Sequence, residues 1–215
     1  MRNAAVDVTS SADADLLLPE GTGPPADIPA EMFTAAVAAY RACDRLDMQA
    51  LARTLGLGRA TLYRRTGNRE RLLDEVVWWH SRIALAAAMD QTAHLRGVPR
   101  IAGLTGSILR SVEADRALHA FLEYDGEAAL RILTGARSVV QQGMSAFLER
   151  LIDLETERGA FRADLDTPTL AFAIVRISEA FLYSDIIADR TPDIERAAAV
   201  VEGLLLGLDR TRQPG

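Results

Sequence analysis

The fold of the N-terminal part is decided by one stretch, Asp47-Met-Gln-Ala-Leu-Ala-Arg-Thr-Leu-Gly-Leu-Gly-Arg-Ala-Thr-Leu-Tyr-Arg-Arg-Thr66. Asp47 can cap a short helix whose inward side carries four apolar residues. These four are Met48, Leu51, Ala52 and Leu55. Gly56 supplies the turn, because a positive φ is favourable only for glycine. Since Leu57 and Leu62 then return to the core, the stretch predicts a helix-turn-helix.

The second helix of this motif presents cations and small polar groups outward. Its outward positions are Arg59, Ala60, Thr61, Tyr63, Arg64 and Arg65. Arginine can bind the guanine edge with two hydrogen bonds, and threonine can contact either kind of base pair. Tyr63, Arg65 and Arg69 are better placed for phosphates. The pattern favours a DNA-reading helix, and its alternative is an ordinary surface hairpin with a solvated basic face.

Charge is distributed unevenly along the chain. Between Arg41 and Arg71, eight arginines stand against Asp44, Asp47 and Glu70, which gives a local net charge of +5. The whole chain carries −6, so the remaining residues sum to −11, and every basic residue is arginine. An acidic protein with one compact basic segment is expected to have a local anion-binding face.

The remainder of the chain reads as successive helices, with no strand-like alternation and no internal repeat, so we expect an all-α fold. Residues 1–28 are rich in small and acidic residues and predict a disordered acidic arm. Apolar spacing, caps and glycines place helices at about 68–94, 99–114, 116–124, 127–134, 136–157, 167–189 and 191–209. Thr167-Pro168 and Thr191-Pro192 are the expected starts of the last two.

Composition narrows the class of protein. No apolar run approaches the roughly 18 residues that cross a bilayer, and no secretory signal precedes the first helix. We therefore expect a cytoplasmic protein without a membrane partner. The single cysteine, Cys43, fits a reducing compartment and is interpreted as a small buried residue.

The motif resembles the TetR family of bacterial transcriptional regulators over about residues 33–80. The matching positions are Leu51-Ala52, Gly56-Leu57, Thr61-Leu62-Tyr63, Asn68-Arg69-Glu70 and Leu72-Leu73. The resemblance implies a three-helix DNA-binding domain at 29–75 and a helical ligand-binding and dimerisation domain at 76–215. It implies base contacts by Arg59, Ala60, Thr61 and Arg64, and phosphate contacts by Tyr63, Arg65 and Arg69. Thr66 and Gly67 depart from the pattern, which has an aromatic and a polar residue there.

Three C-terminal stretches resemble the QsdR-like branch of that family, which is associated with the catabolism of lactone-type signals. They are Arg131-Ile-Leu-Thr-Gly135, Ala171-Phe-Ala-Ile-Val-Arg-Ile-Ser-Glu-Ala-Phe-Leu-Tyr183 and Thr191-Pro-Asp-Ile-Glu195. The resemblance implies a repressor that binds a palindromic operator and is released by a small amphipathic effector, a lactone or an acyl compound. Activation instead of repression stays open.

The expected helix 167–189 is apolar nearly all round and must bury both sides. The family resemblance supplies a partner, a homodimer with a four-helix bundle built from the last two helices of each subunit. The expected interface residues are Phe181, Val201, Leu204, Leu205 and Leu208. The alternative is a central helix in a monomeric bundle.

Polar and aromatic residues within apolar helices are candidates for contacting an effector. Arg176 and Glu179 lie three residues apart with Tyr183 one turn further, and they form either a structural ion pair or part of a pocket. The other candidates are Trp79, Phe121, Tyr124, Arg137 and Gln141, each of which can equally be core or surface.

No enzyme motif is found in the sequence. The glycine-rich segments lack the lysine of a phosphate-binding loop, and His80, His94 and His119 do not have the spacing of a metal site. We expect no catalytic residue, no metal and no cofactor. The alternative function is a helical-bundle enzyme acting on a small molecule, with an incidental helix-turn-helix-like hairpin.

Overall fold

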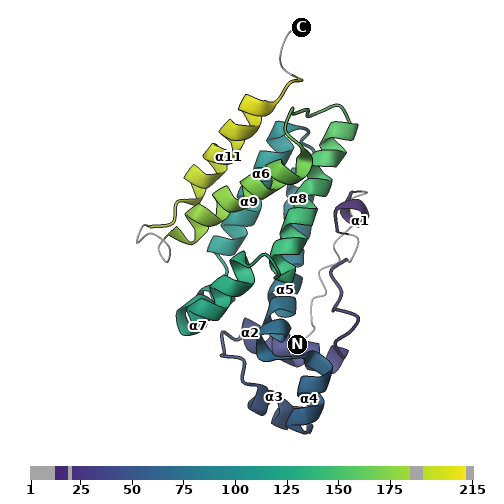
Figure 1. The fold of residues 1–215 in the computed structure, drawn as a ribbon, viewed down its shortest axis with the longest axis vertical. Helices are drawn as coiled ribbons and strands as arrows, with labels where there is room; N and C mark the ends of the chain where they lie inside the picture. Colours follow the sequence, from purple (N-terminus) through teal and green to yellow (C-terminus); the bar gives the residue numbers. More distant parts are fainter. Residues whose placement is uncertain (1–12, 19–20, 185–190, 212–215) are drawn as a thin grey trace. The chain divides into compact units, whose positions relative to one another are not determined.

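The computed structural model describes residues 13–18, 21–184 and 191–211, and throughout these ranges the regular structure is helical, which confirms the all-α prediction (Figure 1). The helices are α1 (Ala14–Leu17), α2 (Ala30–Arg41), α3 (Met48–Thr54), α4 (Arg59–Thr66), α5 (Arg69–Thr92), α6 (Val98–Glu113), α7 (Arg116–Thr134), α8 (Val139–Glu157), α9 (Thr167–Leu182) and α11 (Ile194–Leu208). Within the described ranges, none of these helices is both long enough and apolar enough to span a bilayer.

The chain forms two compact units. Unit 1 comprises residues 1–21, 82–110 and 147–215, and unit 2 comprises residues 22–81 and 111–146. The long helices α5 and α8 each contribute residues to both units. The domain division predicted from the sequence, 29–75 and 76–215, stays a prediction.

Unit 2 is built on the apolar stripe of α2. The four residues spaced along this stripe are all buried, and they are Phe33, Ala36, Val37 and Tyr40. α5 and α8 approach each other closely here, because a Cβ atom at Gly143 would lie 2.3 Å from the Trp78 ring. Glycine at position 143 therefore permits the contact, and any side chain would force the two helices apart.

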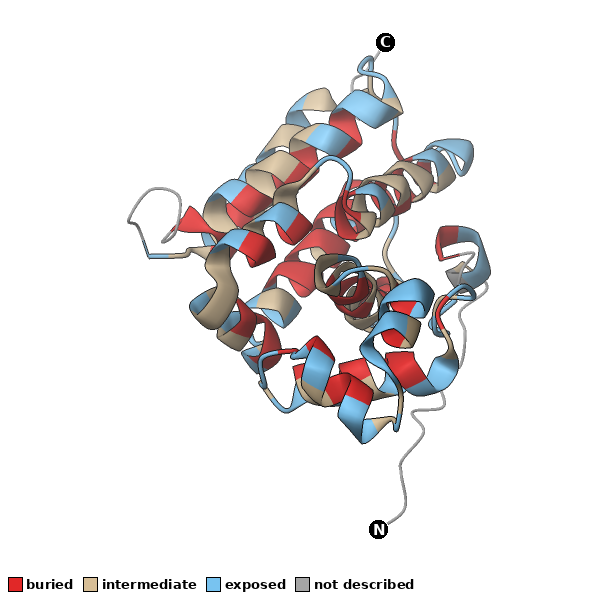
Figure 2. Ribbon diagram, turned by 60° about the horizontal axis from the view of Figure 1, so that its bottom comes forward, coloured by how far each residue is buried: buried red, intermediate tan, exposed pale blue. Residues whose placement is uncertain are grey.

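Unit 1 contains α6 up to Arg110 and the helices α9 and α11, which pack side by side (Figure 1). Most residues of α6 between positions 98 and 109 are buried, including the charged Arg100. Leu109, Ile194 and Ala197 form an apolar cluster against which Phe181 and Leu182 pack. In both units the helices carry buried residues along one side and exposed residues along the other (Figure 2).

The predicted break between the helices 116–124 and 127–134 is confirmed. Both lie within α7, but Asp125 leaves the helical conformation there, with φ −152° and ψ 48°, and kinks the helix. Other predicted boundaries need correction. The helix expected from residue 136 begins at Val139, and the end of the helix expected at 167–189 falls partly on residues 185–190, outside the described residues.

The last two helices start with aspartate instead of threonine. Asp166 accepts a hydrogen bond from the Thr169 backbone N–H at 3.0 Å, and Asp193 accepts one from the Arg196 N–H, also at 3.0 Å. A carboxylate caps a helix N-terminus as well as a hydroxyl does, and it interacts favourably with the helix dipole. Each proline thus lies within the first turn or just before it, as proline requires.

The prediction of a disordered arm over residues 1–28 is wrong for residues 13–18 and 21–28, which the structure describes. α1 lies in this segment, and Leu17, Leu18 and Ile28 are buried. The composition of the segment concealed these contacts, because they are made with residues far away in the chain.

Candidate nucleic-acid interface

The turn between α3 and α4 has the predicted geometry. The Asp47 carboxylate accepts hydrogen bonds from the backbone N–H groups of Gln49 (2.7 Å) and Ala50 (3.2 Å), and these bonds hold the pKa of Asp47 below its usual value. Gly56 has φ 65°, a conformation in which other residues are strained. The Leu57 N–H then returns to the Ala52 carbonyl at 2.9 Å, which closes the end of α3.

Two residues fix the inner side of α4. Leu62 and Thr66 are both fully buried, and the Thr66 hydroxyl donates to the Leu62 carbonyl at 3.0 Å. The buried Thr66 hydroxyl thus has a hydrogen-bond partner within its own helix. Gly67 follows with φ 74° and ends the helix. Thr66 and Gly67 thus fit the end of α4, although both depart from the family pattern.

The outer side of α4 is open to solvent. Arg59, Ala60, Tyr63, Arg64 and Arg65 are exposed, and Thr61 is half-buried. The Arg59 guanidinium lies 5.9 Å from the centre of the Tyr63 ring, within reach of a cation–π interaction. Six of the seven predicted DNA-contacting side chains are thus brought together on one short helix.

The seventh residue, Arg69 at the start of α5, is held by unit 2 itself. Its Nε donates to the Leu46 carbonyl at 2.8 Å, and its Nη1 donates to the Asp125 carboxylate. Its Nη2 is buried and has no hydrogen-bond partner among the described residues. In this arrangement the guanidinium fastens the loop before α3 to the kink of α7, a role that the sequence did not indicate.

Further contacts within unit 2 connect α7 to the same region. The Tyr124 hydroxyl donates to the Asp44 carbonyl at 3.1 Å, and burial raises the pKa of Tyr124. Arg131 bonds Glu70 at 3.1 Å. Three polar contacts therefore connect the kinked helix α7 to the loop before α3 and to the start of α5.

The effector candidates in unit 2 do not form one cluster. Phe121 is fully buried and packs against Tyr124, with ring centroids 5.9 Å apart. Trp79 donates its indole N–H to the Thr22 carbonyl at 2.8 Å. Gln141 is buried and donates to the Leu133 carbonyl, whereas Arg137 is exposed.

The three effector candidates in unit 1 lie together on α9 and at its end. Arg176 and Glu179 form an ion pair at 3.1 Å, and Arg176 also stacks on the Phe172 ring at 5.4 Å. Tyr183 is buried, and its pKa is raised by burial and by the nearby Glu179 charge. The ion pair between Arg176 and Glu179 is thus present. Contact of these three residues with an effector stays a prediction.

A shallow groove between α6 and α11 in unit 1 is lined by small residues and by the ion pair of Arg110 with Glu195. None of the eight effector candidates is among its lining residues. Among the described residues, no three or more His, Cys, Asp or Glu side chains are grouped so as to hold a metal ion.

The predicted dimer residues divide into two sets. Val201 and Leu205 are fully buried within the chain itself, so no surface of theirs is left for a partner to cover. Phe181, Leu204 and Leu208 are half-buried. The apolar residues that α9 and α11 expose most are Phe172 (58%), Val200 (42%) and Leu206 (41%), none of which was in the predicted set. Residues that face the core and residues that face outward recur with the helical period along α9 and α11. Because these helices are apolar on nearly every side, the sequence alone does not show which residues face the core.

A compact helix-turn-helix with an exposed arginine-bearing second helix, followed by a larger helical region, defines the class of one-component DNA-binding regulators. The model of the tetracyclin repressor-like C-terminal domain matches residues 96–206, more than half of the chain. The chain belongs to the tetracycline repressor-like (TetR) family of transcriptional regulators. This membership indicates a regulator rather than an enzyme. No curated protein matches the chain.

Solved structures with the same fold include the following three regulators. The R. erythropolis transcriptional repressor QsdR of the TetR family is 29% identical, with a TM-score of 0.76 over 85% of this chain and 96% of that chain. The fatty acid degradation regulator FadR from Bacillus halodurans is 20% identical, with a TM-score of 0.53 over 82% and 93%. FadR from Bacillus subtilis, solved in complex with stearoyl-CoA, is 14% identical, with a TM-score of 0.54 over 81% and 96%. The two FadR structures share the fold alone.

Proposed function

We propose that the protein is a repressor that binds a palindromic operator through α4. Arg59, Ala60, Thr61 and Arg64 contact base edges, while Tyr63 and Arg65 contact phosphates. The observation that carries the proposal is the division of α4 into a fully buried side and an outer side on which three arginines are exposed. The 29% identity to a transcriptional repressor supports repression over activation.

The protein acts as a homodimer in this proposal. One helix-turn-helix covers a few base pairs, and a twofold pair reads half-sites about 34–36 Å apart. The exposed apolar residues of α9 and α11 support self-association through that helix pair, with Phe172, Val200 and Leu206 added to the half-buried Phe181, Leu204 and Leu208. Binding to chromosomal DNA places the protein in the cytoplasm.

A small amphipathic effector, an acyl or lactone compound, releases the operator. It acts by binding the DNA-incompetent arrangement more tightly, and its effect is limited by that difference in affinity. The long helix α5 is the natural lever, because it begins one residue after the capping Asn68 and contributes residues to both units. The resemblance of residues 131–135 and 171–183 to the QsdR-like branch favours this effector class.

Selection of bound sequences from random duplex DNA tests the proposal. The expected result is an enriched imperfect palindrome with half-sites one helical turn apart. Arg59→Ala combined with Arg64→Ala should abolish the enrichment, whereas Arg162→Ala, which removes an exposed arginine between α8 and α9, should leave it unchanged. Lack of any enriched sequence with the unaltered chain would contradict DNA reading.

A further inference from the structure

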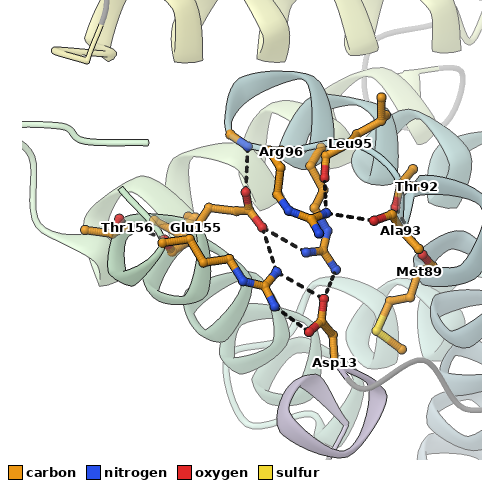
Figure 3. A network of polar contacts seen from close by, with 12 residues as sticks. Asp13, Met89, Thr92, Ala93, Leu95, Arg96, Glu155 and Thr156 are labelled. Carbon is orange, nitrogen blue, oxygen red and sulfur yellow. Dashed lines mark hydrogen bonds and ion pairs between the residues drawn. The ribbon is translucent and has the colours of Figure 1, made fainter. Parts of the chain in front are cut away.

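Asp13, which immediately precedes α1, is held by two arginines of unit 1 (Figure 3). The Arg100 Nη2 donates to its Oδ2 at 2.6 Å. The Arg158 Nη2 donates to Oδ1 at 2.6 Å and the Arg158 Nη1 to Oδ2 at 3.1 Å. Three charge-assisted hydrogen bonds from two planar guanidinium groups are a strong arrangement for binding one carboxylate. The Arg158 hydrogen bonds lower the pKa of Asp13 to about 2.

Beneath Asp13 lies a buried ion pair. The side chains of Arg100 and Glu155 are both 0% exposed, and their ion pair measures 2.8 Å. Glu155 also accepts from the Gly97 N–H at 2.6 Å and from Arg158 at 3.3 Å. Two carboxylates thus neutralise two guanidinium groups. Without the Asp13 carboxylate the cluster would carry +1, with Arg100 still out of water, which is energetically costly.

The segment that supplies Asp13 depends on this docking. α1 has four residues, far fewer than an isolated helix needs in water. Its Leu17 and Leu18 are buried, and the Leu17 carbonyl accepts from the Arg150 Nε at 3.0 Å. The segment therefore presents a carboxylate at one end and apolar groups about one turn further along.

We propose that Arg100 and Arg158 form a carboxylate-binding site that Asp13 fills from within the chain, and that an aliphatic carboxylate binds there by displacing residues 13–18. The monoanion restores the charge that Asp13 provided, and its alkyl chain covers the surface vacated by Leu17 and Leu18. A phosphate dianion fits the charge less well, because it would leave the cluster at −1. The inference rests on the proposed function in that it gives the acyl effector a site and a head group.

Calorimetry with decanoate tests the site. Asp13→Asn removes the internal carboxylate and keeps its shape, so this variant should bind decanoate at least about tenfold more tightly than the unaltered chain, which must first release its own segment. Asp15→Asn is the matched control, because Asp15 is an exposed acid on the same short helix. It should bind decanoate as the unaltered chain does. Adding Arg158→Gln to Asp13→Asn should abolish the gain.

Two control ligands separate the contribution of the carboxylate charge from that of the alkyl chain. Decanol should not show the gain, and neither should inorganic phosphate. If Asp13→Asn gains no affinity, or if decanol binds it as well as decanoate, the site is a structural ion cluster only and the inference is wrong. Because calorimetry uses no DNA, this failure is distinguishable from a failure of DNA selection.

A second measurement uses the unaltered chain and does not depend on any variant folding. Displacement of residues 13–18 should release the backbone of this segment and expose the buried Leu17 to chymotrypsin. Decanoate should therefore accelerate cleavage in this segment in proportion to its occupancy, whereas decanol should not. Cleavage in the segment that is unchanged at saturating decanoate would also overturn the inference.

Discussion

The arginines of α4 and those around Asp13 are chemically identical but differ in what supplies their counter-charge. Arg59, Arg64 and Arg65 lie on an exposed helix face, whereas Arg100 is fully buried between Glu155 and Asp13. A guanidinium stays ionised in both settings, so a buried one must be neutralised by the protein itself. An exposed one can remain hydrated until an external anion replaces the water.

Exposure, rather than residue type, therefore separates the arginines that we propose to bind DNA from those that hold the fold. The comparison involves no difference between lysine and arginine, because the chain contains no lysine. Local charge along the sequence located the exposed set correctly. It gave no sign of the buried Arg100, whose partners Asp13 and Glu155 come from distant segments.

The largest effect is expected from breaking the buried arginine cluster. Arg100→Met leaves the buried Glu155 without its main ion-pair partner and leaves Asp13 with Arg158 alone, and we expect it to lower the free energy of unfolding by about 3–5 kcal/mol. Arg110→Met is the matched control on the same helix, α6, since Arg110 and its partner Glu195 are both more than half exposed. It should cost less than about 1 kcal/mol. Urea denaturation measures both, and equal losses would contradict the comparison.

A smaller and more selective effect is expected on the exposed side of the comparison. Arg59→Ala or Arg64→Ala should change the preference between the selected operator and base-substituted operators by about 1–3 kcal/mol, if a bidentate guanine contact is lost. Fluorescence anisotropy with each duplex measures the change at constant salt. If both variants lose affinity uniformly across sequences, the arginines contact phosphates and the assignment of base reading is wrong.

The helix-turn-helix was predictable because its determinants are local. The cap at Asp47, the positive φ of Gly56 and the burial of Leu62 all follow from neighbours within a few residues. The all-α class followed for the same reason, since helical spacing repeats over short windows. Once Leu62 is assigned to the buried side of α4, the helical period places the arginines of α4 on the exposed side.

The other features of the structure could not be predicted, because they depend on contacts between residues far apart in the sequence. Asp13 meets Arg158 across 145 positions of the chain, so a segment with the composition of a disordered arm is docked instead. Likewise, the choice between Val201 and Val200 as the outward residue of α11 depends on how α9 packs against it. A helix that is apolar on every side leaves that choice open in the sequence.

Arg69 is intermediate in exposure between the two sets of arginines, and its substitution has the smallest expected effect. It was predicted to contact phosphates, yet its side chain is 25% exposed and bonds Asp125 and the Leu46 carbonyl. If Arg69 is released to DNA, Arg69→Ala should weaken all sequences alike and flatten the salt dependence of binding by about one unit. Asp125→Asn should then leave that slope unchanged or steepen it, because it frees the guanidinium.

If Arg69 instead acts only by fastening α7 to the loop before α3, the two variants should behave alike. Both would weaken DNA binding at every salt concentration with an unaltered slope, since no phosphate contact disappears while the support of the α3 loop does. Affinities measured between about 50 and 200 mM salt decide between the two outcomes. A flattened slope for Arg69→Ala alone assigns Arg69 to the exposed set, and parallel lines for both variants assign it to the buried set.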